Sequence, residues 1–158
     1  MSPSIPTEAA AALYCTYWVN QQWFGVDAQY VREVHAVTDL TPVPGAPAGA
    51  AGYVNLRGQL FLVLDARVLL LGERRSKQES TQLVVFRATA GESFALLVDV
   101  LADMLYVSGD QIDAPDADRL NIARDGVTVG SARMEDGLLT LIDPRQLLPA
   151  VFSGPVKI

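Results

Sequence analysis

The sequence predicts an all-β protein with short helices, built from two similar small β-barrels in tandem. Two observations lead to this fold class. Short apolar runs with strand-like content are separated by Gly, Asn, Asp and Pro residues, and the chain matches itself at fixed offsets. The chain has 158 residues, 50% of them hydrophobic, which is enough for one globular domain with its own core.

The predicted strands follow a tail that is rich in Pro, Ser and Ala. We expect residues 1–12 to form a disordered tail, and residues 151–158 to form a C-terminal tail. The strands are predicted over residues 13–19, 23–27, 59–65, 81–88, 93–99, 126–132 and 138–143. Residues 73–80 are predicted to be a charged connection between the two barrels.

Two short helices are predicted between these strands. The first covers residues 27–36, with Asp27 as N-cap. The second covers residues 65–72, where Asp65 caps the helix and Gly72 ends it. An aspartate at the end of a strand can accept the free amides of the next helix, so Asp65 is predicted to have a structural role.

An internal repeat supports the tandem arrangement. An offset of 78 residues superimposes Gly52, Leu60, Asp65, Arg67 and Leu69 on Gly130, Leu138, Asp143, Arg145 and Leu147. An offset of 70 residues superimposes Phe24, Val31, Glu33 and Val34 on Phe94, Leu101, Asp103 and Met104. Because the matches keep their order in both arms, we infer two copies of one unit of roughly 60 to 70 residues.

Composition excludes several classes of function. A net charge of −6 argues against binding of nucleic acid or of anionic lipid. Cys15 and His35 are the only residues of their types, so no Cys/His metal site is expected, and no cofactor is expected. Cys15 is predicted to be a small core residue, and His35 an ordinary one beside the helix.

The sequence also predicts a location in the cytoplasm. The first fifteen residues lack a basic region and contain Glu8, which is unlike a signal peptide. Asp65 and Arg67 interrupt the longest apolar run, so no membrane insertion is expected.

Four segments resemble the CheW-like family of chemotaxis coupling proteins. "GYVNLRGQLFLVLDARVLL" resembles the family signature, with its N-L-R-G turn, apolar strand and aspartate. The other segments similar to the family's are "WFGVDAQYVREV", "FALLVDVLADMLYVSGDQI" and "VGSARMEDGLLTLIDPRQLL". The resemblance runs from about Leu13 to Leu148, nearly the whole chain outside the tails.

The resemblance implies a fold of two five-stranded, SH3-like β-barrels in one domain covering residues 13–150. We place barrel 1 at about residues 20–79. Barrel 2 is placed at about residues 80–150, together with the first strand over residues 13–19. The implied activity is scaffolding without catalysis: such proteins bind the cytoplasmic tip of methyl-accepting chemoreceptors and the regulatory domain of the histidine kinase CheA.

Candidate binding residues follow from the matching motifs. We expect Arg57 and Glu33 to form an ion pair, which either shapes the receptor-binding groove or contacts a partner directly. Apolar residues placed near the groove between the barrels are Val31, Val34, Val98, Leu101 and Leu105, each of which could instead belong to the core. Gly52, Asn55 and Gly58 are expected to set the backbone geometry near the kinase-facing loops.

One part of the family pattern is not matched. Residues 113–126 form an acidic connection where the family docks a second kinase contact. The apolar residue of that contact could be Leu120 or Ile122.

Two other functions remain open from the sequence. A duplicated unit that supplies Asp65 and Asp143 could form the carboxylate pair of an aspartic-type hydrolase. The residues that follow them, Ala66-Arg67 and Pro144-Arg145, do not resemble the Thr/Ser-Gly of those enzymes. A coupling protein of a non-flagellar chemosensory pathway, controlling pili, surface behaviour or a second messenger, would share the same fold.

Overall fold

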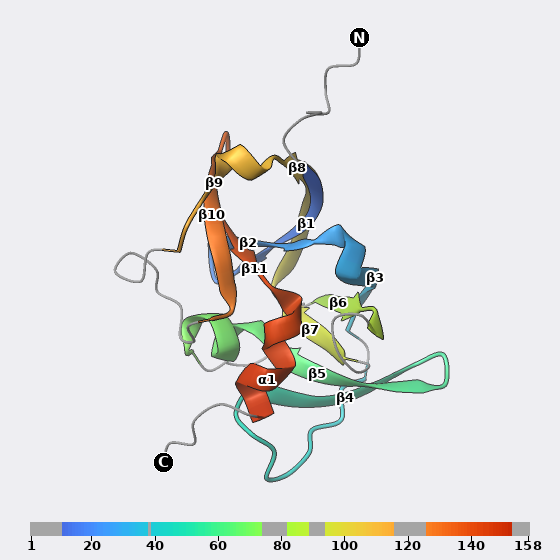
Figure 1. Cartoon of the computed structure of the whole chain (residues 1–158). Helices are drawn as coiled ribbons and strands as arrows, with labels where there is room; N and C mark the ends of the chain where they lie inside the picture. Colours follow the sequence, from blue (N-terminus) through green and yellow to red (C-terminus); the bar gives the residue numbers. More distant parts are fainter. Residues whose placement is uncertain (1–10, 38, 74–81, 89–93, 116–125, 153–158) are drawn as a thin grey trace.

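The computed structural model describes residues 11–37, 39–73, 82–88, 94–115 and 126–152, and this part of the chain is mostly β (Figure 1). The strands are β1 (Ala12–Val19), β2 (Gln22–Asp27), β3 (Val31–Ala36), β4 (Ala50–Leu56), β5 (Gln59–Asp65), β6 (Gln82–Phe86), β7 (Phe94–Val98), β8 (Val100–Val107), β9 (Ile112–Asp113), β10 (Thr128–Met134) and β11 (Gly137–Ile142). The helical segments are η1 (Ala28–Tyr30), η2 (Arg67–Leu71), η4 (Gly109–Gln111), η5 (Pro144–Gln146) and α1 (Leu147–Phe152). The predicted fold class is confirmed.

The strands form two sheets, of six and five strands, where two five-stranded units were predicted. The six-stranded sheet has the order β8-β1-β2-β11-β10-β9, and the five-stranded sheet has the order β3-β6-β7-β5-β4. β5 runs parallel to β7, and β11 runs parallel to β2. The remaining strand pairs are antiparallel.

The internal repeat is visible in the strand registers. Gly52 lies opposite Val63 in the β4–β5 hairpin, and Gly130 lies opposite Leu141 in the β10–β11 hairpin, a shift of 78 residues in both strands. Both hairpins have an irregular register just before this glycine. The parallel pairs β5–β7 and β11–β2 also correspond, so the repeat is a repeat of structure.

The chain crosses from one sheet to the other twice, and the sequence predicted only that the first strand joins barrel 2. β3 follows β2 through η1 but pairs with β6 in the five-stranded sheet. β8 follows β7 after one residue but pairs with β1 in the six-stranded sheet. The predicted boundaries, about 20–79 and 80–150, therefore do not separate the sheets: β2 lies in the six-stranded sheet, and β6 and β7 lie in the five-stranded one.

The helix predicted over residues 27–36 is wrong after its first turn. Asp27 does cap a helix, since its Oδ1 accepts a hydrogen bond from Gln29 N at 3.0 Å, but η1 ends at Tyr30. From Val31 onward the chain is strand β3, with half-buried and exposed residues alternating. Val31 and Val34 are β-branched and suit a strand, and pairing with β6 satisfies the backbone there.

The second predicted helix is present as a five-residue turn, although the residue directly before it is Ala66 and not Asp65. Arg67 N donates to Asp65 Oδ1 at 3.0 Å, and the helical turn η2 then runs to Leu71. Gly72 ends it in the left-handed conformation at φ 69°, and its N–H donates to the carbonyls of Arg67 and Val68. This turn carries Leu69 and Leu70 into the core.

Buried side chains form three clusters. One fills the interior of the five-stranded sheet and includes Phe61, Leu83 and Leu97, and a second in the six-stranded sheet includes Trp23 and Leu139. The largest lies between the sheets and combines side chains from both.

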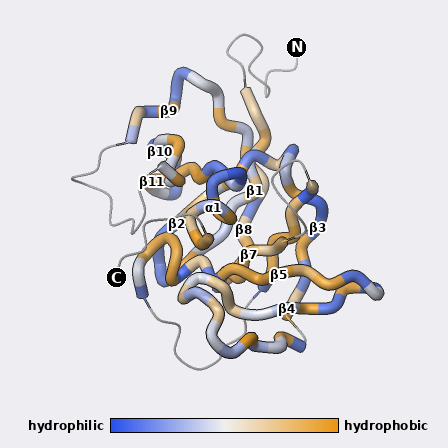
Figure 2. The backbone as a smooth tube through the Cα atoms, turned by 60° about the horizontal axis from the view of Figure 1, so that its bottom comes forward, coloured by the Kyte–Doolittle hydropathy of each residue, from blue (hydrophilic) through white to orange (hydrophobic). Residues whose placement is uncertain are grey.

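β6 and β7 contribute to two of these clusters. Along β7, Phe94, Leu96 and Val98 face the cluster between the sheets, while Ala95 and Leu97 face the interior of their own sheet. Burial on both faces explains why these strands are apolar without alternation. The tube of Figure 2 shows the neighbouring β5 as hydrophobic along most of its length.

Some predictions lie outside the described residues. They concern the tails within residues 1–10 and 153–158, most of the charged connection 73–80, and both candidates for the second kinase contact, Leu120 and Ile122.

Candidate functional site

The turn that presents Arg57 is a two-residue hairpin between β4 and β5. Arg57 has φ 53° and Gly58 has φ 84°, and a tight hairpin turn of this kind needs positive φ at both positions. Asn55 Oδ1 accepts a hydrogen bond from Gly58 N at 2.9 Å, which closes the turn. The predicted backbone roles of Asn55 and Gly58 are therefore observed, and Arg57 itself shares the left-handed conformation.

The expected ion pair between Arg57 and Glu33 is present. Arg57 Nη2 donates to Glu33 Oε2, which joins the turn to β3. The Arg57 side chain remains 58% exposed, and the Glu33 side chain 24%. The pair fixes a strand, rather than the predicted helix, against the turn.

Two further residues contact the same carboxylate, and the sequence analysis did not assign them to the site. His35 Nε2 lies 3.1 Å from Glu33 Oε1, and Arg32 Nε lies 3.8 Å from Glu33 Oε2. The Arg32 guanidinium also lies over the ring of Phe61, 5.8 Å from its centroid. The spacing of Glu33 and His35, two residues apart on one strand, was the signal available in the sequence.

The charges around Glu33 alter its pKa. Desolvation acts to raise the pKa, but hydrogen bonds from Arg57 and His35 and the charges of both outweigh it, so the pKa of Glu33 lies below its usual value. Glu33 therefore remains a carboxylate throughout the neutral range.

The apolar candidates differ in their exposure. Val34 is 45% exposed on β3, whereas Val31, Leu101 and Leu105 are partly buried. For Val98 the core alternative holds, because its side chain is fully buried in the cluster between the sheets. Met104, the repeat counterpart of Val34, is 50% exposed on β8 and was not among the candidates.

The two aspartates of the repeat have capping roles. Asp143 Oδ1 accepts a hydrogen bond from Arg145 N at 3.0 Å, as Asp65 does from Arg67 N. Arg145 also binds both Asp143 oxygens through its guanidinium, at 3.0 Å each. Asp65 and Asp143 end strands of different sheets, so the arrangement is that of two separate helix caps.

Arg67 has a different partner from its repeat counterpart. Its Nη2 lies 2.8 Å from Asp99 Oδ2, and its Nε lies 3.3 Å from Asp99 Oδ1. Asp99 Oδ2 also accepts a hydrogen bond from Asn20 N at 2.7 Å. This network ties η2 to the connection between β7 and β8, and to the β1–β2 turn.

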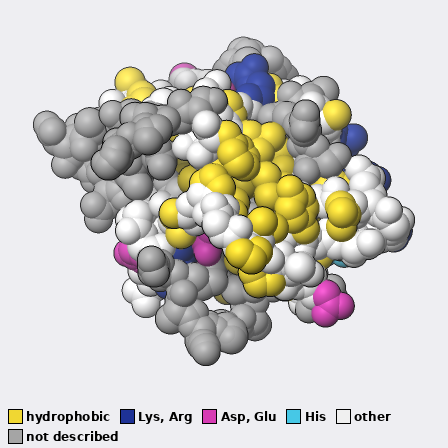
Figure 3. Space-filling view, turned by 90° about the horizontal axis from the view of Figure 1, so that it is seen from below, with side chains coloured by type: hydrophobic (Ala, Val, Ile, Leu, Met, Phe, Trp, Pro, Cys, Tyr) yellow, Lys and Arg dark blue, Asp and Glu magenta, His cyan; other side chains and the backbone are white. Residues whose placement is uncertain are grey.

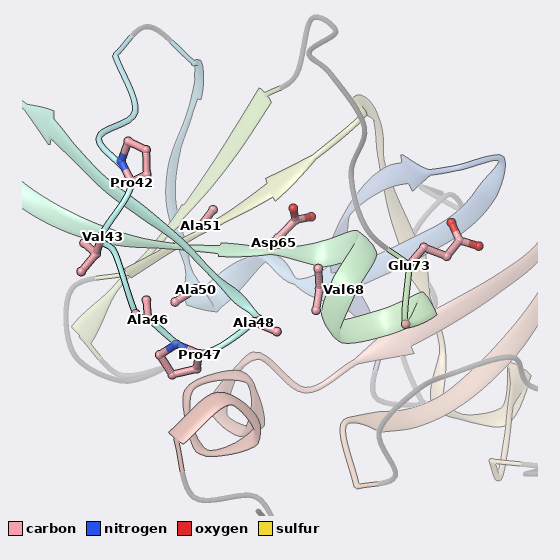
Figure 4. Close-up of a pocket in the computed structure, with 12 residues that line it drawn as sticks. Pro42, Val43, Ala46, Pro47, Ala48, Ala50, Ala51, Asp65, Val68 and Glu73 are labelled. Atoms are coloured by element: carbon pink, nitrogen blue, oxygen red, sulfur yellow. The ribbon is translucent and has the colours of Figure 1, made fainter. Parts of the chain in front are cut away.

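A cavity of about 530 Å³ lies beside η2 (Figure 4). Small and apolar residues of segment 42–51 line one side of it, and Asp65, Val68, Gly72 and Glu73 line the other. Figure 3 views the molecule from the side on which α1 and β4 lie in Figure 1, and shows hydrophobic side chains gathered on that face. The exposed large hydrophobic residues of these elements and of segment 42–51 are Val43, Tyr53 and Phe152.

Other polar candidates are buried or have local partners. Cys15 is 4% exposed, as predicted for a core residue, and burial raises the pKa of its thiol. Within the described ranges, no group of three or more His, Cys, Asp or Glu residues could hold a metal ion. None of the helices in the described part of the chain is long and apolar enough to cross a membrane.

Comparison with known proteins identifies the family. A model described as the CheW-like domain matches residues 14–152. The chemotaxis protein CheW of Rhizobium meliloti (strain 1021) is 28% identical over 132 residues, covering 84% of each chain. That of Klebsiella aerogenes is 23% identical over 141 residues, covering 89% of this chain and 84% of the relative.

A solved structure supports the fold. The scaffolding protein TtCheW from Thermoanaerobacter tengcongensis superimposes with a TM-score of 0.74 at 20% identity, over 90% of this chain and 88% of the other. The family match includes both sheets, the Arg57 turn and the Glu33 strand. The resemblance inferred from the four segments is confirmed, and this chain belongs to the family of proteins with a CheW-like domain.

Proposed function

We propose that this protein is a non-enzymatic adaptor, which couples the cytoplasmic tips of chemoreceptors to the regulatory domain of a CheA-like histidine kinase. The observation that carries this proposal is the CheW-like match over residues 14–152, which includes nearly all of the described chain. Both partners would meet the protein in the cytoplasm. A scaffold acts by binding, so its working parts are surfaces with exposed anchor residues.

Two surfaces suit these partners. The Arg57 turn presents an exposed guanidinium on a rigid hairpin, held by Glu33. Val34 and Met104 lie at equivalent positions of β3 and β8, the edge strands of the two sheets, and are about half exposed. A receptor helix could pack on such apolar anchors, because helix-in-groove binding needs only a few of them.

Titration calorimetry with the regulatory domain of a CheA-like kinase from the same genome tests the kinase arm. We expect a dissociation constant on the order of micromolar for the wild type. Arg57→Ala should weaken binding about tenfold if Arg57 contacts the kinase domain. Arg133→Ala, an exposed arginine on β10, is the matched control and should bind like the wild type.

The receptor arm is tested with a soluble fragment of a chemoreceptor tip. Met104→Ser and Val34→Ser should each weaken binding of this fragment, with the melting temperature nearly unchanged because both side chains are half exposed. Wild-type protein that binds neither the kinase domain nor the receptor fragment would contradict the adaptor function.

A further inference from the structure

The cluster around Glu33 contains more positive charge than its carboxylate can balance. Arg57 Nη2 and Arg32 Nε both approach the same oxygen, Oε2 of Glu33. The other oxygen, Oε1, faces His35 Nε2 at 3.1 Å. One negative charge therefore serves two guanidinium groups.

The surplus charge is accessible. Arg32 is 44% exposed and Arg57 is 58% exposed. In the described part of the chain, Glu33 supplies the only carboxylate within 4.0 Å of either guanidinium. A guanidinium has five N–H donors in a planar fork, so each arginine retains donors that Glu33 does not use.

Both arginines are also held in place. Arg32 lies over the Phe61 ring, which is buried in the interior of the five-stranded sheet. Arg57 belongs to a closed two-residue turn and is bound to Glu33. Less side-chain entropy is lost on binding when the donors are already positioned.

We propose that Arg32 and Arg57 together form a recognition site for a carboxylate side chain of a protein partner, with Glu33 and His35 as positioning residues. The partner's Asp or Glu would supply the second negative charge that the two guanidinium groups lack. This site deepens the adaptor function, and the identity of the protein that supplies the carboxylate rests on that proposed function.

The test uses the full-length, ¹⁵N-labelled protein and follows the side-chain Nε–Hε NMR signals of its arginines. The probe is the blocked tripeptide acetyl-Gly-Glu-Gly-amide, with acetyl-Gly-Gln-Gly-amide as the neutral control, both at constant ionic strength. We expect saturable shifts of the Arg32 and Arg57 signals with the Glu peptide alone, and an unmoved Arg133 signal. Arg32→Gln should weaken binding of the Glu peptide about fivefold, and Arg32→Lys by less, because lysine keeps the charge but loses the fork.

Three results would overturn the proposal. The first is equal shifts with the Gln peptide, and the second is the absence of any saturable shift in the wild type. The third is stronger binding of inorganic phosphate than of the Glu peptide, which would identify a phosphate site. The comparison of peptides on the wild-type protein does not depend on the folding of any variant.

A parallel titration separates this site from the adaptor function. If the wild type binds the kinase domain or receptor tip but neither peptide shifts the arginine signals, the carboxylate site is rejected and the adaptor function stands. If the Glu peptide binds as expected but neither protein partner does, the site stands and the proposed partners are rejected.

Discussion

At the scale of single residues, Glu33 organises the exposed edge of the five-stranded sheet. Its two oxygens are divided between His35 on one side and the two arginines on the other. Arg57 reaches it from a turn with positive φ at Arg57, which is uncommon for a residue other than glycine.

The lowered pKa of Glu33 predicts a pH dependence of stability. A carboxyl group whose pKa is lower in the folded than in the unfolded protein stabilises the fold fully above the unfolded pKa, about 4.3 for Glu. This contribution is lost as the pH falls through the folded pKa. Urea unfolding from pH 7 to pH 3 should thus show wild type more stable than Glu33→Gln near neutrality, with the difference vanishing in acid.

The matched control for this experiment is Glu135→Gln, which changes an exposed glutamate in the β10–β11 turn. Its difference from the wild type should be smaller than that of Glu33→Gln at pH 7. A constant difference between the wild type and Glu33→Gln from pH 7 to pH 3 would contradict the assigned pKa direction.

At the scale of elements, each repeat contains a hairpin that a neighbouring segment approaches closely. A Cβ atom at Gly52 would lie 2.3 Å from the carbonyl oxygen of Thr41, and one at Gly130 would lie 2.3 Å from that of Asp113. Thr41 and Asp113 pair with Tyr53 and Ser131, the residues that follow these glycines. The glycines of the repeat are thus explained by backbone contact.

Substitution of these glycines should destabilise the protein strongly. Gly52→Ala places a methyl group against backbone and at φ 148°, so we expect a loss of about 2 kcal/mol or more in the free energy of unfolding. Gly130→Ala should have a similar effect for the steric reason alone. Gly58→Ala, which has positive φ but open space around it, should cost only about 1 kcal/mol.

Urea unfolding of the three variants at neutral pH measures this order. Equal losses in Gly52→Ala and Gly58→Ala would show that backbone conformation, and not the approach of Thr41, determines the requirement for glycine at residue 52.

At the scale of the whole molecule, the two sheets should unfold as one cooperative unit, because each sheet contains two strands from the other half of the chain. The second half of the chain forms most of the six-stranded sheet, to which the first half adds β1 and β2. The first half forms most of the five-stranded sheet, to which the second half adds β6 and β7. The largest buried cluster lies between the sheets and draws side chains from both. Neither sheet can therefore lose its structure without exposing the core that it shares with the other.

A variant in one sheet should consequently alter unfolding reported from the other. Both tryptophans of the chain, Trp18 and Trp23, lie in the six-stranded sheet, where their rings stack. Leu83→Ala, in the core of the five-stranded sheet, should lower the free energy of unfolding by about 2–5 kcal/mol, as measured by tryptophan fluorescence. Circular dichroism should give the same transition midpoint.

Leu60→Ala serves as the control, because Leu60 lies on the same sheet but is 60% exposed. Its effect should stay within about 0.5 kcal/mol. The sheets would unfold independently if Leu83→Ala shifted the unfolding midpoint measured by circular dichroism but not the midpoint measured by tryptophan fluorescence.

The local sequence determined much of this protein's structure, because the interactions concerned join residues close in sequence or occur in both repeats. A pattern that occurs twice in the sequence explains the paired glycines, the aspartates that cap η2 and η5, and the hairpin registers. The Arg57–Glu33 pair was also expected, through the family motif and the complementary charges.

Only the tertiary structure decided the features that depend on partners distant in sequence. Residues 31–36 form a strand because the backbone of β6 is there to pair with them, and a local helical pattern cannot report that. Val98 is in the core because β7 is covered on both faces. Arg32 joins the Glu33 cluster because Phe61, on another strand, lies beneath its guanidinium. In each case the deciding free energy comes from packing or pairing between segments that the chain brings together only on folding.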